Sequence, residues 1–408
     1  MNHFFNVKTL EEVLAMAGTF APVEPETVET GRACSRVLAD DIKALEDLPG
    51  FRRSTMDGYA VDASSTFGAS ESGPAWLEIT GAVAMGEIPE FELAAGQAAR
   101  ISTGGMLPKG ADAVVMVEHT EAVDEASVEI YKSVAPLQNV IDASEDFARE
   151  SIVLEKGSLV RPQEAGLAAG LGYNKLPVYK VPVVGIISTG DEVIPLDQAP
   201  GPGRIRDINS YSLAGFVEEA GATAIRYGIV GDDPAALKQI CEKALAETDM
   251  VLISGGSSVG AKDYTVEVLS GLSDTEILVH GMSVSPGKPT ILARSGRIPV
   301  WGLPGQVVSA MVVLKVAVIP FLNRLRGLEK PMRQIRVPAR LTRNVASAQG
   351  RRDFVRVRLA QGADGTEARP VMGKSGLIRT MVHADGLLEI GEHVEGLEKD
   401  SLVDIILL

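Results

Sequence analysis

The chain has 408 residues and a net charge of −15, because 54 Asp and Glu outnumber 39 Lys and Arg. Its length predicts about two to four domains, and a 45% hydrophobic content with 23% charged residues excludes a disordered protein. The acidic balance argues against binding to bulk nucleic acid or an anionic membrane, so an anionic ligand would need local Arg or Lys side chains.

The first part of the chain predicts one helix and then a series of short strands. Thr9 and Glu12 have the spacing of a capping box, so we expect a helix from Leu10 to Ala17. After Pro49-Gly50, apolar runs separated by turn residues indicate a β-rich domain over residues 51–146. The expected strands are Trp76–Thr80, Ala98–Ser102, Ala113–Glu118 and Val128–Tyr131.

Residues 147–180 contain a glycine-dotted helical stretch, Gln163–Leu171, and form one discontinuous linker domain with residues 1–50 in our interpretation. From 181 to 327, apolar runs alternate with helical segments, which predicts a mostly parallel sheet covered on both faces. The strand candidates are Val183–Ile187, Thr223–Val230, Met250–Ile253 and Pro299–Leu303. The expected helices are Ser210–Ala220, Pro234–Glu247 and Gln306–Arg326.

Three polar loops in this α/β region point to an anion site. Val251–Asp263 is an apolar run that breaks into glycines and serines, Ser188–Glu192 brings carboxylates, and Ser285–Pro289 brings Lys288. Glycines let backbone N–H groups turn toward an oxyanion. One such loop is equally typical of a plain strand-to-helix turn, but three together favour an anion at the carboxyl ends of the strands.

The last segment of the chain predicts a separate small domain. Residues 328–408 alternate in polarity around Phe354–Leu359, and Ala363-Asp364-Gly365 predicts a hairpin, so we expect a small β domain.

Cys34 and Cys241 predict neither a disulfide framework nor a zinc site and favour the cytoplasm. No signal peptide is expected, and Val307–Leu322 predicts a buried helix rather than a membrane span.

Several motifs follow one another along nearly the whole chain. They are STMDGYA at 54–60, TGG at 103–105, LPKGADAVV at 107–115, STGDEV at 188–193, GGSSVGAKD at 255–263, PGKP at 286–289 and GLPG at 302–305. This set resembles the MoeA family of molybdopterin molybdenumtransferases, which are related to the E domain of gephyrin. The resemblance implies insertion of molybdate into adenylylated molybdopterin with release of AMP, assisted by Mg²⁺.

The resemblance also implies an architecture and partners. The expected domains are a discontinuous linker and dimerisation domain (1–50 and 147–180), a β-rich inserted domain (51–146), a MogA-like α/β molybdopterin-binding domain (181–327) and a C-terminal β-barrel (328–408). Family members are homodimers whose active site is completed by the second subunit. Expected partners are a MogA-type molybdopterin adenylyltransferase and molybdoenzyme-maturation proteins, with neither nucleic acid nor membrane.

The resemblance assigns the chemistry to carboxylates and one lysine: Asp57, Glu192, Asp232, Asp263 and Lys288. Asp57, Glu192 and Asp263 are also the expected metal ligands, because Mg²⁺ takes oxygen ligands and bridges to phosphate. From the residues alone, Asp57 could instead cap a turn, and either Asp232 or Asp233 could cap the helix that follows. Asp146 is a weaker candidate.

The residues expected to bind the substrate are Thr103, Thr189, Gly190, Gly255, Gly256, Ser257, Ser258, Gly260, Pro304, Arg351 and Ser375. Arg351, with Arg352 and Arg356, either lies on a solvated strand face or binds phosphate or molybdate. Ser285 and Gln306-Val307 depart from the family pattern, so the oxyanion preference stays open. The alternatives are a tungstate-inserting homologue, a molybdopterin adenylyltransferase and a non-catalytic scaffold.

Overall fold

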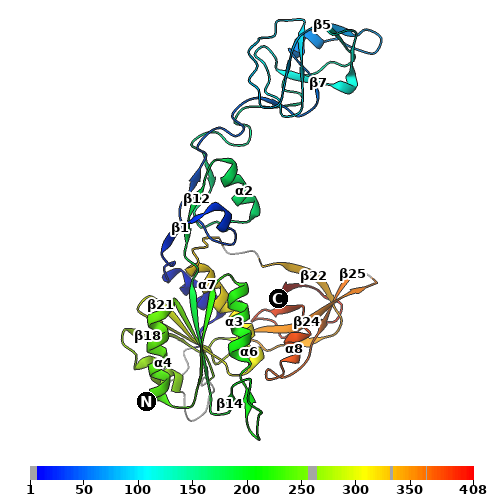
Figure 1. The fold of residues 1–408 in the computed structure, drawn as a ribbon. Coiled ribbons are helices and arrows are strands. Elements are labelled where there is room, and N and C mark those ends of the chain that lie inside the picture. The colour runs from blue at the N-terminus through cyan, green and yellow to red at the C-terminus, as the bar shows by residue number, and fades with distance from the viewer. Residues whose placement is uncertain (1–6, 256–263, 331–333, 364) are drawn as a thin grey trace. The chain divides into compact units, whose positions relative to one another are not determined.

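The computed structural model describes residues 7–255, 264–330, 334–363 and 365–408, drawn in Figure 1. The chain divides into two compact units. Unit 1 comprises Met1–Asp40, Lys156–Pro162 and Lys175–Leu408, and unit 2 comprises Asp41–Glu155 and Gln163–Asn174. The boundaries of the four expected domains stay predictions.

Unit 2 is β-rich, as the turn residues predicted. Its main sheet has the strand order β7-β4-β6-β5-β9-β8, in which only β5 and β6 run parallel. The strands are β4 (Gly58–Val61), β5 (Ala75–Val83), β6 (Gln97–Ile101), β7 (Ala113–Met116), β8 (Thr120–Ala122) and β9 (Ser127–Ile130). The four strands expected from the sequence are therefore present, with ends shifted by a few residues at most.

Short pairings and one helix complete unit 2. β2 (Ile42–Lys43) pairs with β11 (Ile152–Leu154), and β3 (Arg53–Ser54) pairs with β10 (Val140–Ile141). The helix α2 (Pro162–Gly170) confirms the helical stretch expected near residue 163.

The main sheet of unit 1 has the order β16-β13-β17-β21-β20-β18. The strands are β13 (Val183–Thr189), β16 (Thr223–Val230), β17 (Met250–Ser254), β18 (Thr275–His280), β20 (Ile291–Ser295) and β21 (Ile298–Leu303). Only β20 runs against the others, so five strands have their carboxyl ends at one edge. The mostly parallel sheet is confirmed, but β18 and β20 were absent from the sequence prediction.

Helices cover both faces of this sheet, because neighbouring strand residues pack into different cores. Ile186, Leu252 and Trp301 belong to the cluster that includes α3 (Asn209–Glu219). Ile187, Ile253 and Val300 belong to the cluster formed with α4 (Pro234–Glu247) and α5 (Tyr264–Ser270). Figure 1 shows α3 and α4 on opposite sides of the sheet. The strands are thus continuously apolar because helices cover both faces of the sheet, as the sequence predicted.

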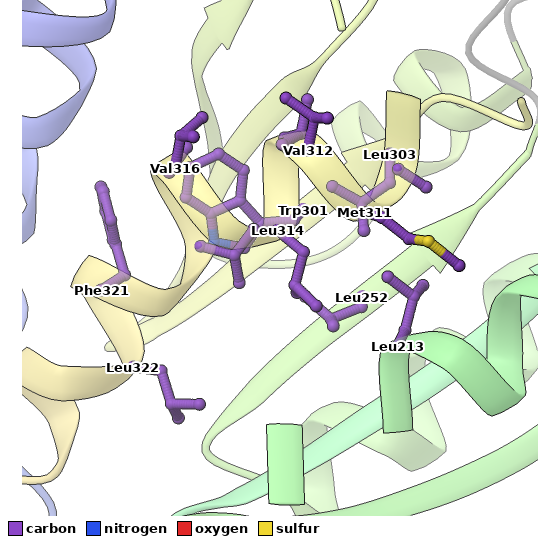
Figure 2. Packing of buried hydrophobic residues seen from close by; sticks show 14 of the residues in the cluster. Leu213, Leu252, Trp301, Leu303, Met311, Val312, Leu314, Val316, Phe321 and Leu322 are labelled. Atoms are coloured by element: carbon purple, nitrogen blue, oxygen red, sulfur yellow. The ribbon is translucent and has the colours of Figure 1, made fainter. Parts of the chain in front are cut away.

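The stretch that begins at Val307 forms a helix within the first of these cores. It consists of α6 (Val307–Val313), a π-helical turn (Leu314–Val318) and α7 (Ile319–Leu325). Among the described residues it is the one helix long and apolar enough to cross a membrane, and 72% of its most apolar window is buried inside the protein. Its side chains pack around Trp301 (Figure 2), as expected for a core helix.

The C-terminal strands close into a five-stranded barrel. β24 (Arg352–Gly362) pairs with both β25 (Gly365–Pro370) and β26 (Gly386–Ile390), and the ring is completed through β22 (Arg336–Leu341) and β28 (Leu402–Leu407). The expected hairpin joins β24 to β25. Outside the ring, β19 (Val284–Ser285) pairs in parallel with β24 and so connects the barrel to the α/β part of unit 1.

The remaining elements of unit 1 are α1 (Leu10–Met16), α8 (Arg379–Val382), two 3₁₀ helices (Ala17–Thr19 and Thr30–Arg32) and three short strand pairs. The pairs are β1 (Pro25–Glu29) with β12 (Lys175–Tyr179), β14 (Val193–Ile194) with β15 (Ile205–Arg206), and β23 (Val345–Ala346) with β27 (Gly396–Leu397). The capping box of Thr9 and Glu12 is confirmed. Cys34 and Cys241 are free, and burial raises the pKa of the Cys241 thiol to about 12.

Candidate functional site

A cavity of about 1030 Å³ lies in unit 1 at the carboxyl edge of the parallel strands. Its walls come from segments 188–193, 205–209, 282–289, 304–309, 348–351 and 375–376, together with the end of β17. The volume suits a ligand at or above ordinary drug size. Seven residues that the sequence singled out for function line it: Thr189, Glu192, Gly255, Lys288, Pro304, Arg351 and Ser375.

The loop after β13 places a carboxylate in the cavity wall. Gly190 has a φ of +132°, and a Cβ there would lie 2.7 Å from Oε2 of Glu192. Glycine is therefore required for the carboxylate to fold back against the loop backbone. No partner of the Glu192 carboxylate is found among the described residues, so its oxygens are available to a ligand.

The neighbouring acids have structural contacts. Asp191 accepts a hydrogen bond on Oδ1 from the backbone N–H of Asp232, at 3.0 Å. Asp233 caps α4, because its Oδ1 accepts from the backbone N–H of Ala235 at 2.9 Å. The helix cap left open by the sequence is thus Asp233. Asp232 is not among the residues that line the cavity, and its catalytic role stays a prediction.

The end of β17 approaches the β13 loop so closely that only glycine fits. Gly255 has a φ of +109°, and a Cβ there would lie 2.4 Å from the carbonyl oxygen of Thr189. Thr189 in turn donates its hydroxyl to the carbonyl of Ser254 at 3.4 Å. The predicted residues Gly256, Ser257, Ser258, Gly260 and Asp263 lie outside the described residues.

Gly255→Ala is expected to weaken ligand binding in the cavity by about 10-fold or more. The added methyl group cannot occupy its place beside Thr189 without moving one of the two strand ends, and the backbone conformation disfavours alanine. Titration of the variant with molybdopterin, the ligand that the motif resemblance implies, measures the loss. The matched control is Gly166→Ala, since a Cβ at Gly166 meets nothing within 4 Å. Equal affinities for both variants would contradict the prediction.

Lys288 reaches the same edge of the sheet by way of a strand that the sequence did not reveal. Its loop lies between β18 and β20, and β18 ends at the carboxyl edge. The Lys288 side chain is exposed and forms no ion pair with any residue that the structure describes. Its ammonium group is therefore available to an oxyanion.

The C-terminal barrel region contains two of the predicted binding residues, Arg351 and Ser375. It also contains Arg352 and Arg356, and the three arginines lie in different environments. Arg351 lines the cavity, whereas Arg352 pairs with Glu11 and Glu389. Arg356 is only 8% exposed, and its Nη2 donates to the carbonyl of Gly373 at 2.8 Å. Burial lowers the pKa of the Arg356 guanidinium. The alternative of a solvated strand face is therefore wrong for Arg356.

Ser375 is joined to the beginning of α6. Its carbonyl accepts the backbone N–H of Val308 at 3.0 Å, which satisfies one of the free donors in the first turn. Gln306 is the residue before the helix and makes no side-chain cap. The helix therefore begins without a side-chain cap, with its first turn anchored to the Ser375 loop.

Several polar residues that the sequence analysis did not assign to the site also line the cavity, among them Ser188, Arg206, Asp207, Asn209 and Ser254. Asp207 accepts from the hydroxyls of Ser188 and Ser210 at 2.9 and 2.5 Å. The Asn209 amide donates to Ser254 Oγ at 2.6 Å and to the Gly305 carbonyl at 2.9 Å. The only local signal is Asp-Ile-Asn before a helix, which reads as an ordinary cap.

Unit 2 contains Asp57, Thr103 and the weaker candidate Asp146, and the first two contact each other. Asp146 is exposed, and its backbone N–H donates to the carbonyl of Leu48 at 3.1 Å. Asp57 Oδ1 accepts from the backbone N–H of Thr103 at 2.7 Å and from its hydroxyl at 3.1 Å. Both residues are exposed. Gly58 beside Asp57 allows close strand packing, since a Cβ there would lie 1.9 Å from the Val115 carbonyl oxygen. The bonds between Asp57 and Thr103 join two loops that are 46 residues apart in the sequence, so the turn-capping alternative and the catalytic role of Asp57 both stay predictions.

The charge of the chain is divided unevenly. Unit 2 holds 22 Asp and Glu against 7 Lys and Arg, a net charge of −15, while unit 1 holds 32 of each kind. The unit that contains the cavity is therefore neutral. An anion in the cavity meets Lys288 and Arg351 without a net negative charge on the surrounding unit. Together with Glu192, these cations suit a phosphate ligand accompanied by a divalent cation.

Three family profiles match the chain in order. The MoeA N-terminal region (domains I and II) matches residues 8–172, a probable molybdopterin binding domain matches residues 185–324, and the MoeA C-terminal region (domain IV) matches residues 338–408. Together these profiles cover most of the chain, including every segment that lines the cavity except Val7.

Known proteins agree with these profiles. A molybdopterin molybdenumtransferase 2 of Mycobacterium tuberculosis is 36% identical over 91% of this chain and 92% of its own. A putative molybdopterin biosynthesis protein of Methanocaldococcus jannaschii is 40% identical over 93% of this chain and 92% of its own. A crystal structure of a MoeA protein from Pyrococcus horikoshii is 37% identical, covers 98% of this chain and 99% of its own, and gives a TM-score of 0.79.

Proposed function

The chain belongs to the MoeA family of molybdopterin molybdenumtransferases, and on this premise we propose that it inserts molybdate into adenylylated molybdopterin and releases AMP. Membership makes the protein a transferase of molybdenum cofactor biosynthesis. The observation that supports the finer proposal is the cavity that Glu192, Lys288 and Arg351 share. Lys288, Arg351 and the free carboxylate of Glu192 suit a substrate with a phosphoanhydride better than a neutral one.

The reaction needs charge neutralisation more than covalent help from the protein. Water or a molybdate oxygen attacks the phosphorus on the pterin side of the phosphoanhydride, the P–O–P bond breaks and AMP leaves. Molybdate then bonds to the two dithiolene sulfurs, and the two thiol protons leave with one molybdate oxygen as water. Lys288 and Arg351 can bind the oxyanions whose charge increases during this step. The polar wall formed by Asp207 and Asn209 is held rigid by its own hydrogen bonds and can orient the substrate.

Mg²⁺ is part of the proposal, and the residues present fit one mode of binding it. The described residues contain no group of three Asp, Glu, His or Cys side chains that could hold a metal ion. Mg²⁺ commonly binds through one or two carboxylates together with phosphate oxygens. Glu192 fits that mode and would hold the ion jointly with the substrate, where Mg²⁺ supplies electrostatic stabilisation of the phosphoanhydride. Asp57 and Asp263 remain predicted ligands.

The protein is further proposed to act as a cytoplasmic homodimer. The partners in this proposal are a MogA-type molybdopterin adenylyltransferase, which would supply the substrate, and molybdoenzyme-maturation proteins, which would receive the product. Sedimentation of the purified protein tests the dimer directly. A monomer at all concentrations would contradict this part of the proposal.

The decisive assay supplies the purified protein with adenylylated molybdopterin, molybdate and Mg²⁺, and measures AMP release together with molybdenum bound to the pterin. We expect both products in equal amounts. Replacing molybdate with tungstate in a parallel reaction determines which oxyanion is preferred. Absence of both products would contradict the proposed reaction.

A second reaction mixture distinguishes the proposed reaction from the main alternative, adenylylation of molybdopterin. An adenylyltransferase would form adenylylated molybdopterin from ATP and molybdopterin without any other protein. We expect no such product from this chain. Its formation, with no molybdate insertion, would assign the protein to that earlier step instead.

A further inference from the structure

We propose that Asp353 is a positioning residue that holds the guanidinium of Arg351 in the cavity wall before an anionic ligand arrives. This inference rests on the proposed function, in which Arg351 contacts the oxyanions of the substrate. Asp353 is not among the residues that line the cavity, so it would act through Arg351 alone.

The two side chains form a two-point contact. Nη2 of Arg351 donates a hydrogen bond to Oδ2 of Asp353 at 3.2 Å, and Nε of Arg351 lies 2.8 Å from Oδ1 in an ion pair that lacks hydrogen-bond geometry. Ser347 also donates its hydroxyl to Oδ2, at 2.9 Å. The contact uses one edge of the planar guanidinium, and Nη1 has no partner among the described residues. A second edge therefore stays available for a ligand.

The pair is asymmetric in burial, which indicates which residue holds the other. The side chain of Asp353 is 8% exposed, whereas the side chain of Arg351 is 46% exposed. A buried carboxylate is costly unless it is paired, so Asp353 has few alternatives to its contacts with Arg351 and Ser347. An exposed arginine side chain, by contrast, normally samples many rotamers. The contact with Asp353 restricts the rotamers of Arg351 before a ligand binds.

The backbone of Asp353 is fixed by strands on both sides. It pairs with Ile390 of β26 and with Ser285 of β19. Ser285 begins the loop that carries Lys288. The pairing of β19 with β24 therefore fixes the backbone segments that lead to Arg351 and Lys288 relative to each other. Asp353 is the side chain that links this paired backbone to the guanidinium of Arg351.

A positioning role and simple electrostatics predict opposite changes in anion affinity when the Asp353 carboxylate is removed. Asp353 is a negative charge near an anion site, so its removal would strengthen anion binding if charge alone mattered. If Asp353 positions Arg351, its removal weakens binding, because the guanidinium loses its fixed orientation. The sign of the effect therefore decides between the two.

The test measures the affinity of the full-length protein for molybdopterin by pterin fluorescence, in a cycle of D353N, R351A and the double variant. We expect D353N to raise Kd about 10-fold, as is typical for an outer residue that orients a binding group. R351A should raise Kd by at least as much, and the double variant should bind no more weakly than R351A. The matched control is R358A, which removes an exposed arginine from the same strand.

Tighter or unchanged binding by D353N, or additive losses in the double variant, would overturn the proposal. R351K gives an answer even where D353N does not fold, because lysine keeps the charge but cannot form the two-point contact. Positioning predicts that R351K binds as weakly as R351A, and wild-type affinity of R351K would contradict it. Because the probe is molybdopterin alone, a failure of molybdate insertion in the wild-type protein leaves this test intact.

Discussion

Glu192→Gln is expected to lower kcat/KM for molybdate insertion by about 100-fold or more, in the range found when one preorganised electrostatic group is removed from an active site. Gln has the same shape as Glu but no charge, and Mg²⁺ prefers carboxylate oxygens. Glu192 lines the cavity and has no partner among the described residues, so the substitution breaks no contact of the fold. The measurement is the rate of AMP release at varied Mg²⁺ concentration.

The same experiment contains its own check. If Glu192 binds Mg²⁺ together with the substrate, the variant needs more Mg²⁺ for half-maximal activity, and its melting temperature stays close to that of the wild type. The matched control is Glu218→Gln, an exposed carboxylate on α3 away from the cavity lining, which is expected to change activity less than twofold. An unchanged Mg²⁺ requirement in Glu192→Gln would count against its assignment as a ligand.

Trp301→Ala is expected to lower the free energy of unfolding by about 3–5 kcal/mol, the usual cost of deleting a large aromatic side chain from a core. Trp301 is completely buried in β21 and makes an edge-to-face contact with Phe321, with ring centroids 5.0 Å apart. Figure 2 shows its indole between the strand and the helix that starts at Val307. Urea denaturation followed by tryptophan-independent circular dichroism measures the loss.

Trp301→Phe is the informative companion to that variant. The indole Nε1 is buried without a hydrogen-bond partner among the described residues, so phenylalanine removes an unsatisfied donor and keeps an aromatic ring. We therefore expect a clearly smaller loss of stability than for alanine. Equal losses in both variants would show that the shape of the indole, rather than buried apolar area, determines the stability of this core.

The sequence predicted the elements whose cause is local. Thr9 and Glu12 form their capping box within four residues, and β16 and α4 have the bounds expected from their apolar patterns. β18 escaped prediction because it lies at the end of the sheet, where it is only partly buried and its apolar pattern is weak. β20 lies between β21 and β18 and is buried, but its short apolar run was not recognised as a strand. Their presence explains why the Lys288 loop reaches the carboxyl edge.

The candidate site was predictable wherever a motif carried its own chemistry. Glu192, Lys288 and Gly255 were selected from such motifs and line one cavity. Asp207 and Asn209 were missed because an Asx residue before a helix is usually a cap, and this local signal does not reveal that Asn209 joins two strand ends. The choice between Asp232 and Asp233 as the cap likewise needed the backbone geometry of α4.

The sequence by itself determined the family, most of the helices and strands of the α/β region and the glycines at which a loop must turn. Only the tertiary structure decided that segments as distant as Glu192 and Ser375 line one cavity, and that Asp353 is buried beneath Arg351. The physical reason is the range of the interactions involved. Capping and periodicity act within a few residues, whereas the cavity depends on the pairing of β19 with β24 and on parallel strands that end at one edge.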